Sequence, residues 1–340
     1  MMSRMLEEAL SAGDAVAAQA APSAATLAAL GARLRTLAPK VALTVARGSS
    51  DHAANYLGYL LMSRLGVPVA SLPMSLVTLG QTPLQVRDQL VLALSQSGRS
   101  PDLVETTRAL TAAGALSVAM VNAEGSPLAE AATVSLPLGA GPELSVAATK
   151  SYIATLAMGA RLVAHWQQDA ALLDALASLP AALHAASQLD WTPAVTALRD
   201  ASRMMVIGRG RTLSIALEAA LKFKETCALQ AEAFSGAEVR HGPMALVDDR
   251  YPMLVFAPRG PEQAGLLEVA REMRGRGARV LLAAPDDVVD RDLPLTSSAH
   301  VDLDPLLAIQ SFYVMAAQLS QARGLDADAP RHLNKVTSTR

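Results

Sequence analysis

Short apolar runs alternate with longer segments of helical periodicity along the chain, and this alternation limits the fold more than any other feature. Runs that indicate strands cover residues 41–46, 67–72, 90–94, 116–121 and 133–138 in the first half, and 204–207, 251–256, 279–284 and 299–303 in the second. A strand that is followed by a helix and then by another strand is typical of a parallel sheet covered by helices on both faces. The sequence therefore predicts an α/β fold.

Similar turns end one strand in each half, which indicates an internal repeat. Val45-Ala46-Arg47-Gly48 matches Val206-Ile207-Gly208-Arg209-Gly210, and between the halves Pro180, Asp190, Trp191 and Pro193 interrupt the helical pattern. We expect four parts: a helical segment at 1–37 that packs outside the first sheet, α/β domains at 38–185 and 195–328, and a C-terminal tail at 329–340.

Composition excludes several classes of protein. Of 340 residues, 51% are hydrophobic and 18% charged, and 29 Lys and Arg stand against 31 Asp and Glu, so no basic excess favours nucleic acid. No run of 18 apolar residues and no signal-peptide pattern occurs, so we expect neither a membrane partner nor secretion. One cysteine fits a reducing, cytoplasmic compartment, and six scattered histidines predict no metal site.

Hydroxyl-rich turns follow two strands of the first half. Gly48, Ser49 and Ser50 end one strand, and Ser95, Gln96, Ser97 and Ser100 follow another. Hydroxyls and free backbone N–H groups at helix N-termini form phosphate sites, although serines at such places also serve only as helix caps. Two such turns in one sheet favour a phosphate site over simple helix capping. The absence of a P-loop motif argues against a nucleoside triphosphate. The turns of the second half lack hydroxyl clusters, so we expect only the first repeat to hold phosphate.

A second group of chemically active residues lies in the second half. Lys222 and Glu225 are three residues apart and share a helix face. A carboxylate beside an ammonium group can act as a general base, although the same pair also occurs as a solvated ion pair. His241 lies in a loop between glycines and suits proton transfer, although a single histidine in a loop is commonly an exposed residue without a function.

Several segments resemble the isomerase half of glucosamine-6-phosphate synthase, which consists of tandem sugar isomerase (SIS) domains. They are IALEAALKFKE at 215–225, AEA at 231–233, EVRHGP at 238–243, SQSG at 95–98, GPELSVAATK at 141–150 and PRHLNK at 330–335. The resemblance covers nearly the whole chain in family order. It implies two flavodoxin-like domains and a homodimer.

The resemblance also assigns roles to residues. Its phosphate ligands correspond to Ser49, Ser50, Ser95, Gln96, Ser97 and Ser100. The base that moves a proton between sugar carbons C1 and C2 corresponds to Glu225, and the ring-opening histidine, which comes from the other subunit, to His241. Lys335 matches the lysine that contacts the carbonyl, Lys222 a supporting lysine, and Val146 and Ala148 backbone contacts to the sugar. We expect that neither a metal nor an organic cofactor is required.

Two departures separate the chain from the synthase. Met2 stands where a glutaminase would carry its cysteine nucleophile, and we expect no glutaminase domain; Arg99 replaces an acidic residue. The segments around Arg99 and Lys335 are more similar to stand-alone SIS-type glucosamine-6-phosphate deaminases. We therefore expect a deaminase that converts glucosamine 6-phosphate to fructose 6-phosphate and ammonia. A fructosamine-6-phosphate deglycase, a galactosamine-6-phosphate deaminase or isomerase, and a non-catalytic sugar-phosphate sensor remain alternatives.

Overall fold

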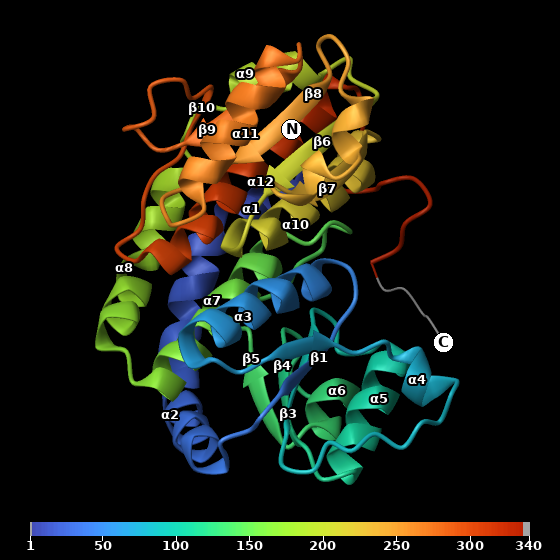
Figure 1. The fold of residues 1–340 in the computed structure, drawn as a ribbon. Coiled ribbons are helices and arrows are strands. Elements are labelled where there is room, and N and C mark those ends of the chain that lie inside the picture. The colour runs from blue at the N-terminus through green and yellow to red at the C-terminus, as the bar shows by residue number, and fades with distance from the viewer. Residues whose placement is uncertain (1, 336–340) are drawn as a thin grey trace. The chain divides into compact units, whose positions relative to one another are not determined.

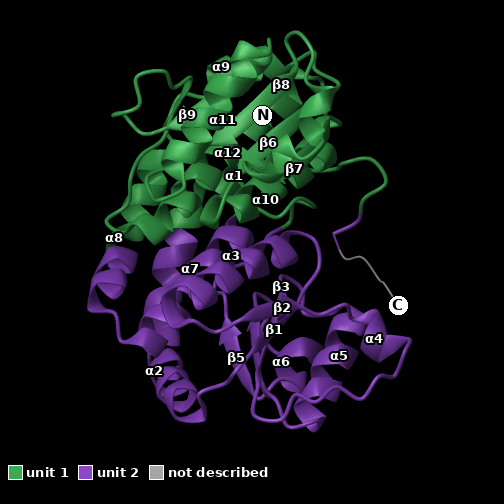
Figure 2. Ribbon diagram, viewed as in Figure 1, with its two compact units in different colours: residues 1–13, 144–149, 178–333 green, residues 14–143, 150–177, 334–340 purple. Residues whose placement is uncertain are grey.

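The computed structural model describes residues 2–335 and has a parallel five-stranded sheet in each half of the chain (Figure 1). Contacts divide the chain into two units (Figure 2). Unit 1 comprises residues 1–13, 144–149 and 178–333, and unit 2 comprises 14–143, 150–177 and the chain from 334. The four parts expected from the sequence are linear segments that this division does not test, and residues 336–340 of the tail lie outside the described residues.

The sheet of unit 2 has the order β2-β1-β3-β4-β5. Its strands are β1 (Ala42–Val45), β2 (Val69–Ser71), β3 (Leu90–Ser95), β4 (Leu116–Val121) and β5 (Val134–Pro137). Its helices are α3 (Ser49–Leu65), α4 (Ser75–Thr78), α5 (Pro101–Ala112), α6 (Pro127–Ala131) and α7 (Lys150–Gln167). Successive strands are added in one direction from β1 to β2 and in the opposite direction from β3 to β5. Right-handed crossovers therefore place α3 on one face of the sheet, and α5 and α6 on the other.

Apolar side chains hold unit 2 together. Every residue of β3 and β4 is buried, as expected for central strands of a sheet covered on both faces. Between the sheet and α5, Val91 and Val121 pack with Leu103 and Leu110. The first strand is fixed beside the third by the parallel register that pairs Val45 with Ala93. The loops that follow these two strands therefore leave the same edge of the sheet.

The sheet of unit 1 repeats this topology, with β7-β6-β8-β9-β10 in the corresponding places. The strands are β6 (Arg203–Gly208), β7 (Gln230–Ser235), β8 (Pro252–Phe256), β9 (Arg279–Ala284) and β10 (Leu293–Pro294). The helices are α9 (Thr192–Leu198), α10 (Arg211–Cys227), α11 (Gln263–Gly275) and α12 (Asp304–Ala322). Phe223 of α10 meets Phe312 of α12 edge to face at 5.0 Å between ring centroids. The predicted repeat and fold class are confirmed.

One strand prediction in the second half is wrong, and two strands, β7 and β10, were not predicted. Residues 299–303 do not form a strand, because Val301–Leu303 is a 3-10 turn and the last strand is the two-residue β10. Strand β7 was not predicted from the sequence. As an edge strand it buries only Ala231 fully and exposes Gln230 and Glu232, so it has no continuous apolar run.

The N-terminal region forms α1 (Arg4–Leu10) and α2 (Ala12–Leu37), and α8 (Ala170–Ala186) ends the first half. The expectation that this whole region packs outside the first sheet is wrong for α1, which packs on α12 of unit 1. Pro180 lies inside α8 instead of breaking it. By length and composition α2 could cross a membrane, with 39% of its apolar window buried. Its Gln19 side chain donates to the carbonyls of Leu138 and Ala154, each at 2.9 Å, which ties α2 to unit 2.

Candidate functional site

The two hydroxyl-rich turns leave neighbouring strands of unit 2 at one edge. Residues 47–50 follow β1 and residues 96–100 follow β3, and these strands lie side by side where the strand order reverses. Ligands of open α/β sheets bind at such a switch point. The structure therefore brings together Gly48, Ser49, Ser50, Ser95, Gln96, Ser97 and Ser100, which we call the hydroxyl cradle.

Hydrogen bonds inside the second loop fix its shape. Buried Ser95 accepts from the backbone N–H of Gly98 at 3.0 Å, and Ser97 accepts from that of Arg99 at 3.4 Å. Ser100 occupies the N-cap position of α5, yet its hydroxyl makes no capping hydrogen bond. Helix capping therefore does not account for Ser100.

An ion pair joins the two loops of the cradle. The Arg47 guanidinium lies 3.1 Å from the Asp102 carboxylate, and the exposed fractions of their side chains are 57% and 2%. The buried carboxylate is in the first turn of α5 and also accepts from the Leu103 N–H at 2.9 Å. Sequence reasoning did not identify this pair. Arg47 was noted only as part of the repeated turn and Asp102 was given no role, and only the fold brings the two residues together.

Gly98 must be glycine for two reasons. Its φ is +62°, and a Cβ there would overlap the Ser126 hydroxyl and lie 2.7 Å from the Ser126 Cβ and 2.8 Å from the Val121 Cγ2. Ser126, the 1% exposed N-cap of α6, thus packs directly against the cradle loop. The close approach of α6 to the loop was not predicted either.

The predicted base lies on α10 of unit 1, where three charges form a chain. The Lys222 ammonium is 2.5 Å from the Glu225 carboxylate and 3.3 Å from that of Glu218, to which the Tyr313 hydroxyl donates at 3.1 Å. Glu218 and Lys222 have side chains 0% and 1% exposed, whereas Glu225 is 20% exposed. Glu225 is thus the member of this charged group whose side chain is partly exposed.

Burial and charge oppose each other at Lys222. Burial alone would lower the pKa of Lys222, but the carboxylates of Glu218 and Glu225 outweigh it, and the pKa is raised above its usual value. Lys222 is therefore an ammonium group throughout the neutral range. It orients Glu225 but is not itself a proton acceptor there.

The other predicted residues of unit 1 lie on different segments. His241 ends the 3-10 turn Glu238–Arg240 and is exposed, and its backbone N–H donates to the Glu238 carbonyl at 2.8 Å. Val146 and Ala148 are half-buried in the segment 144–149. The Glu8 carboxylate anchors this segment, because it accepts from the backbone N–H groups of Leu144 and Ser145.

Lys335 is placed in unit 2 by a buried carboxylate. Its ammonium lies 3.4 Å from Glu143, whose side chain is 0% exposed and also accepts from the Ser151 hydroxyl at 2.6 Å. Asn122 ties the segment before Glu143 to the edge of the cradle. Its side-chain amide donates to the Gly141 carbonyl at 2.9 Å, and its backbone N–H donates to the Ser95 carbonyl at 3.3 Å. Glu143 lies inside a motif used for the resemblance, but it was given no role.

Cys227, the only cysteine, is buried at the end of α10. Burial raises the pKa of its thiol to about 11. Because the thiolate is the reactive form, we expect Cys227 to resist iodoacetamide at neutral pH in the native protein and to react fully in denaturant, as mass spectrometry would show. The buried neutral thiol contributes to the stability of the fold at pH values below the pKa that the thiol has in the unfolded chain. This contribution is lost as the pH rises through about 11. Fast native alkylation would contradict the buried position.

Residues 2–335 hold no group of three or more His, Cys, Asp or Glu that could bind a metal. The expectation of neither a metal nor a cofactor remains a prediction from the sequence.

A family model for the SIS domain matches residues 39–164 and 197–320, which contain the two sheets. The glutamine–fructose-6-phosphate aminotransferase (isomerizing) of Aeropyrum pernix is 36% identical over 330 residues, which cover 87% of this chain and 51% of that protein. The enzyme of the same name from Zymomonas mobilis is 33% identical over 74% of this chain and 44% of its own. The chain spans about half the length of these curated relatives.

Solved structures show the same fold over nearly the whole chain. A candidate phosphosugar isomerase of Silicibacter pomeroyi DSS-3 is 41% identical, with a TM-score of 0.91 over 96% of this chain and 100% of that one. A glucosamine-6-phosphate deaminase of Thermotoga maritima is 20% identical, with a TM-score of 0.77 over 99% of this chain and 100% of that one. At that identity the second likeness concerns the fold alone.

Proposed function

Because the chain belongs to the SIS-domain family, with two SIS domains in tandem, we propose that it is an amino-sugar-phosphate isomerase that releases ammonia. Its substrate is glucosamine 6-phosphate and its products are fructose 6-phosphate and ammonia. The observation that carries the proposal is the partly exposed Glu225 carboxylate, held at 2.5 Å by a buried ammonium group. A protein that only sensed sugar phosphates would not require such a base.

The hydroxyl cradle binds the phosphate. Its serine hydroxyls and the N-termini of α3 and α5 supply neutral donors to an anion. Arg47 adds a positive charge and offsets the buried Asp102, which would otherwise repel a phosphate dianion. The phosphate fixes the sugar chain, and this positioning supplies much of the rate enhancement.

The proton transfer then proceeds in the open-chain sugar, after His241 has assisted ring opening. Glu225 removes the proton from C2, the C1 aldehyde oxygen is protonated, and the proton held by Glu225 is delivered to C1. An imine remains at C2. Water adds to this imine, and the C–N bond breaks to release ammonia and leave the ketone of fructose 6-phosphate. Lys335, whose charge Glu143 balances, faces the carbonyl in this proposal, with Val146 and Ala148 as backbone contacts.

An ammonia-release assay over a panel of sugar phosphates tests the proposal. We expect release from glucosamine 6-phosphate together with stoichiometric fructose 6-phosphate. Release only from galactosamine 6-phosphate or from a fructosamine 6-phosphate would support the corresponding alternative enzyme. Binding of the esters without turnover of any of them would contradict enzymatic function and favour a sensor.

Arg47 provides a test of the cradle alone. We expect Arg47→Met to raise the KM for the sugar phosphate about tenfold or more and to change kcat less, because the lost charge acts on the bound phosphate and not on the proton transfer. The matched control is Arg108→Met, which removes an exposed arginine from the same helix as Asp102. Equal KM values for the two variants in steady-state assays would remove Arg47 from phosphate binding.

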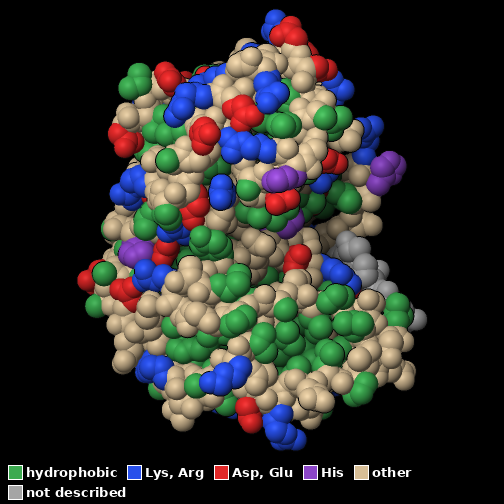
Figure 3. Space-filling view, viewed as in Figure 1, with side chains coloured by type: hydrophobic (Ala, Val, Ile, Leu, Met, Phe, Trp, Pro, Cys, Tyr) green, Lys and Arg blue, Asp and Glu red, His purple; other side chains and the backbone are tan. Residues whose placement is uncertain are grey.

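We further propose a homodimer in which His241 acts in the site of the partner copy. The exposure of His241 and of Leu246 (59%) near it supports a covered position in a dimer. A second exposed apolar region includes Leu76 (41%) and Leu79 (72%), and hydrophobic side chains gather over the face of unit 2 around α5 and α6 (Figure 3).

Subunit mixing tests the exchange of His241. Equal amounts of inactive Glu225→Gln and His241→Asn chains form half heterodimers, each with one intact site of two. We therefore expect about one quarter of wild-type activity on mixing after dissociation. If both residues served the same site from one chain, every site would keep one defect and activity would stay near zero.

A further inference from the structure

The second repeat has its own switch-point crevice, at the carboxyl ends of β6 and β8 in unit 1. The topology of the two sheets is the same, so this crevice corresponds to the one between β1 and β3. The glycines that cap the following helices adopt nearly the same conformation, with φ and ψ of 53° and −132° at Gly48 and of 57° and −125° at Gly210. The backbone that forms a phosphate crevice is thus retained.

The content of the two crevices differs. A Cβ built on Gly48 meets no atom within 4 Å, whereas a Cβ on Gly210 would overlap the Glu262 carboxylate and lie 2.8 Å from its Cδ. Glu262 is the N-cap of α11, which is the position that Ser100 occupies before α5. A carboxylate therefore stands in the second repeat where the first repeat has a hydroxyl.

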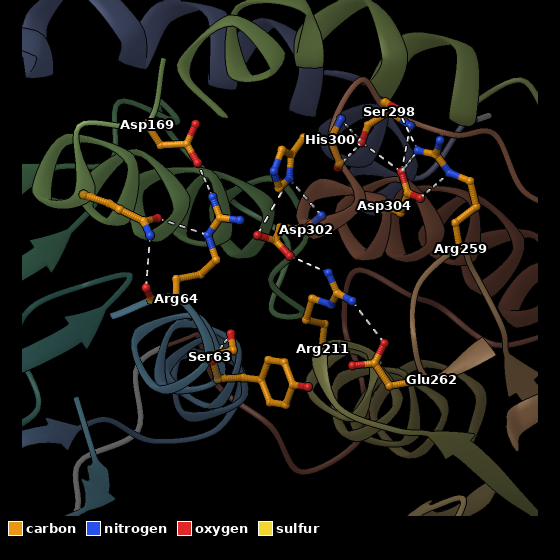
Figure 4. Close-up of polar contacts among 12 residues, drawn as sticks. Ser63, Arg64, Asp169, Arg211, Arg259, Glu262, Ser298, His300, Asp302 and Asp304 are labelled. Atoms are coloured by element: carbon orange, nitrogen blue, oxygen red, sulfur yellow. Dashed lines mark hydrogen bonds and ion pairs between the residues drawn. The ribbon is translucent and has the colours of Figure 1, made fainter. Parts of the chain in front are cut away.

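A buried guanidinium binds this carboxylate. Arg211, the first residue of α10, donates to Glu262 at 3.1 Å and to Asp302, and its side chain is 9% exposed (Figure 4). Burial alone would lower the pKa of Arg211, but the two carboxylates outweigh it and raise it. On the next loop, Arg259 is held by Asp304 at 2.9 Å. Arg211 and Arg259 are thus engaged by acids of unit 1, whereas Arg209, which corresponds to Arg47 in the repeat, is exposed.

We propose that the second repeat keeps an anion-binding crevice which its own Glu262 carboxylate occupies in place of a phosphate. Arg211 and the N-terminus of α10 act on Glu262 as they would on a bound anion. The first repeat differs because its bridging arginine, Arg47, is 57% exposed and leaves Gly48 open. The ligand class of the opened crevice is inorganic phosphate or a phosphate monoester. The inference depends on the proposed function only in taking the hydroxyl cradle as a phosphate site.

The test replaces Glu262 by the residue type of the first repeat. In a Ser50→Ala/Ser97→Ala background, which weakens the cradle, we expect Glu262→Ser to bind inorganic phosphate at least about tenfold more tightly than its parent, because the side chain that fills the crevice is gone. Isothermal titration calorimetry measures the affinity. With an intact cradle, the stoichiometry should rise from one phosphate per chain to two.

Control variants separate occupancy from charge. Glu262→Gln keeps the crevice filled and should gain no binding; a gain equal to that of Glu262→Ser would overturn occupancy as the cause. Glu268→Ser removes an exposed carboxylate (66% exposed) from the same helix and should also gain nothing. An equal gain there would show a nonspecific charge effect and overturn the proposal.

Folding of the variants is checked by thermal unfolding with and without phosphate. A phosphate-dependent rise in Tm of Glu262→Ser above that of its parent supports the site by linkage, and Glu262→Thr provides a second hydroxyl variant if the serine variant does not fold. Folded variants without any gain in affinity or Tm overturn the inference. Absence of phosphate binding by the wild-type chain would instead contradict the cradle, and with it the proposed function.

Discussion

Glu225→Gln should lose turnover and keep substrate binding. The amide has the size of the carboxylate and can still accept from the Lys222 ammonium, which lies 2.5 Å from Glu225, but it cannot accept the C2 proton. General-base catalysis contributes about 10²–10⁴-fold, so we expect kcat to fall by about that factor while KM changes less than about threefold. Steady-state assays of fructose 6-phosphate and ammonia release measure both.

The matched control is Glu232→Gln, an exposed carboxylate on β7 of the same unit. It should leave kcat unchanged. Loss of solvent exchange at C2 in Glu225→Gln, followed by NMR in deuterium oxide, would identify the missing step as proton abstraction. An active Glu225→Gln enzyme would disprove the proposed base.

The sequence allowed prediction of those parts of the molecule that depend on local patterns. Strands β3 and β4 are buried on both faces and therefore appear as continuous apolar runs. Ser100 followed by Pro101 is a local pattern typical of a helix start, and α5 begins at Pro101. Lys222 and Glu225 are brought together by helix geometry alone, which the sequence spacing already contains.

Other features depend on contacts between distant segments. Arg47 and Asp102 are 55 residues apart, and Glu143 and Lys335 are 192 apart, so no spacing rule brings them together. The predicted strand at 299–303 is instead a 3-10 turn, in which the His300 ring caps the turn by accepting from the Asp302 N–H at 3.2 Å. Glu218 is the exception, because its i,i+4 spacing from Lys222 could have been recognised.

Gly98→Ala should impair phosphate binding by the cradle far more than the strain of its left-handed backbone conformation alone would predict. Gly98 and Gly125 have nearly equal φ values, +62° and +61°, so alanine at either position carries the same left-handed strain of about 1–2 kcal/mol. Only at Gly98 does the added Cβ overlap the Ser126 hydroxyl, since at Gly125 it meets no atom within 4 Å. Overpacking adds about 1–3 kcal/mol and shifts the loop that carries Ser97 and Ser100.

We therefore expect Gly98→Ala to reduce kcat/KM for glucosamine 6-phosphate by about 10²-fold, because small misplacements of binding groups have effects of this size. Gly125→Ala should lose stability in thermal unfolding but keep its KM. Ser126→Gly removes the hydroxyl and the Cβ that the new methyl group would meet at 2.7 Å, so Gly98→Ala/Ser126→Gly should recover part of the binding, with Val121 at 2.8 Å limiting the rescue. If Gly98→Ala and Gly125→Ala have equal KM values, the loop conformation does not control phosphate binding, and the cradle would have to be assigned to other residues.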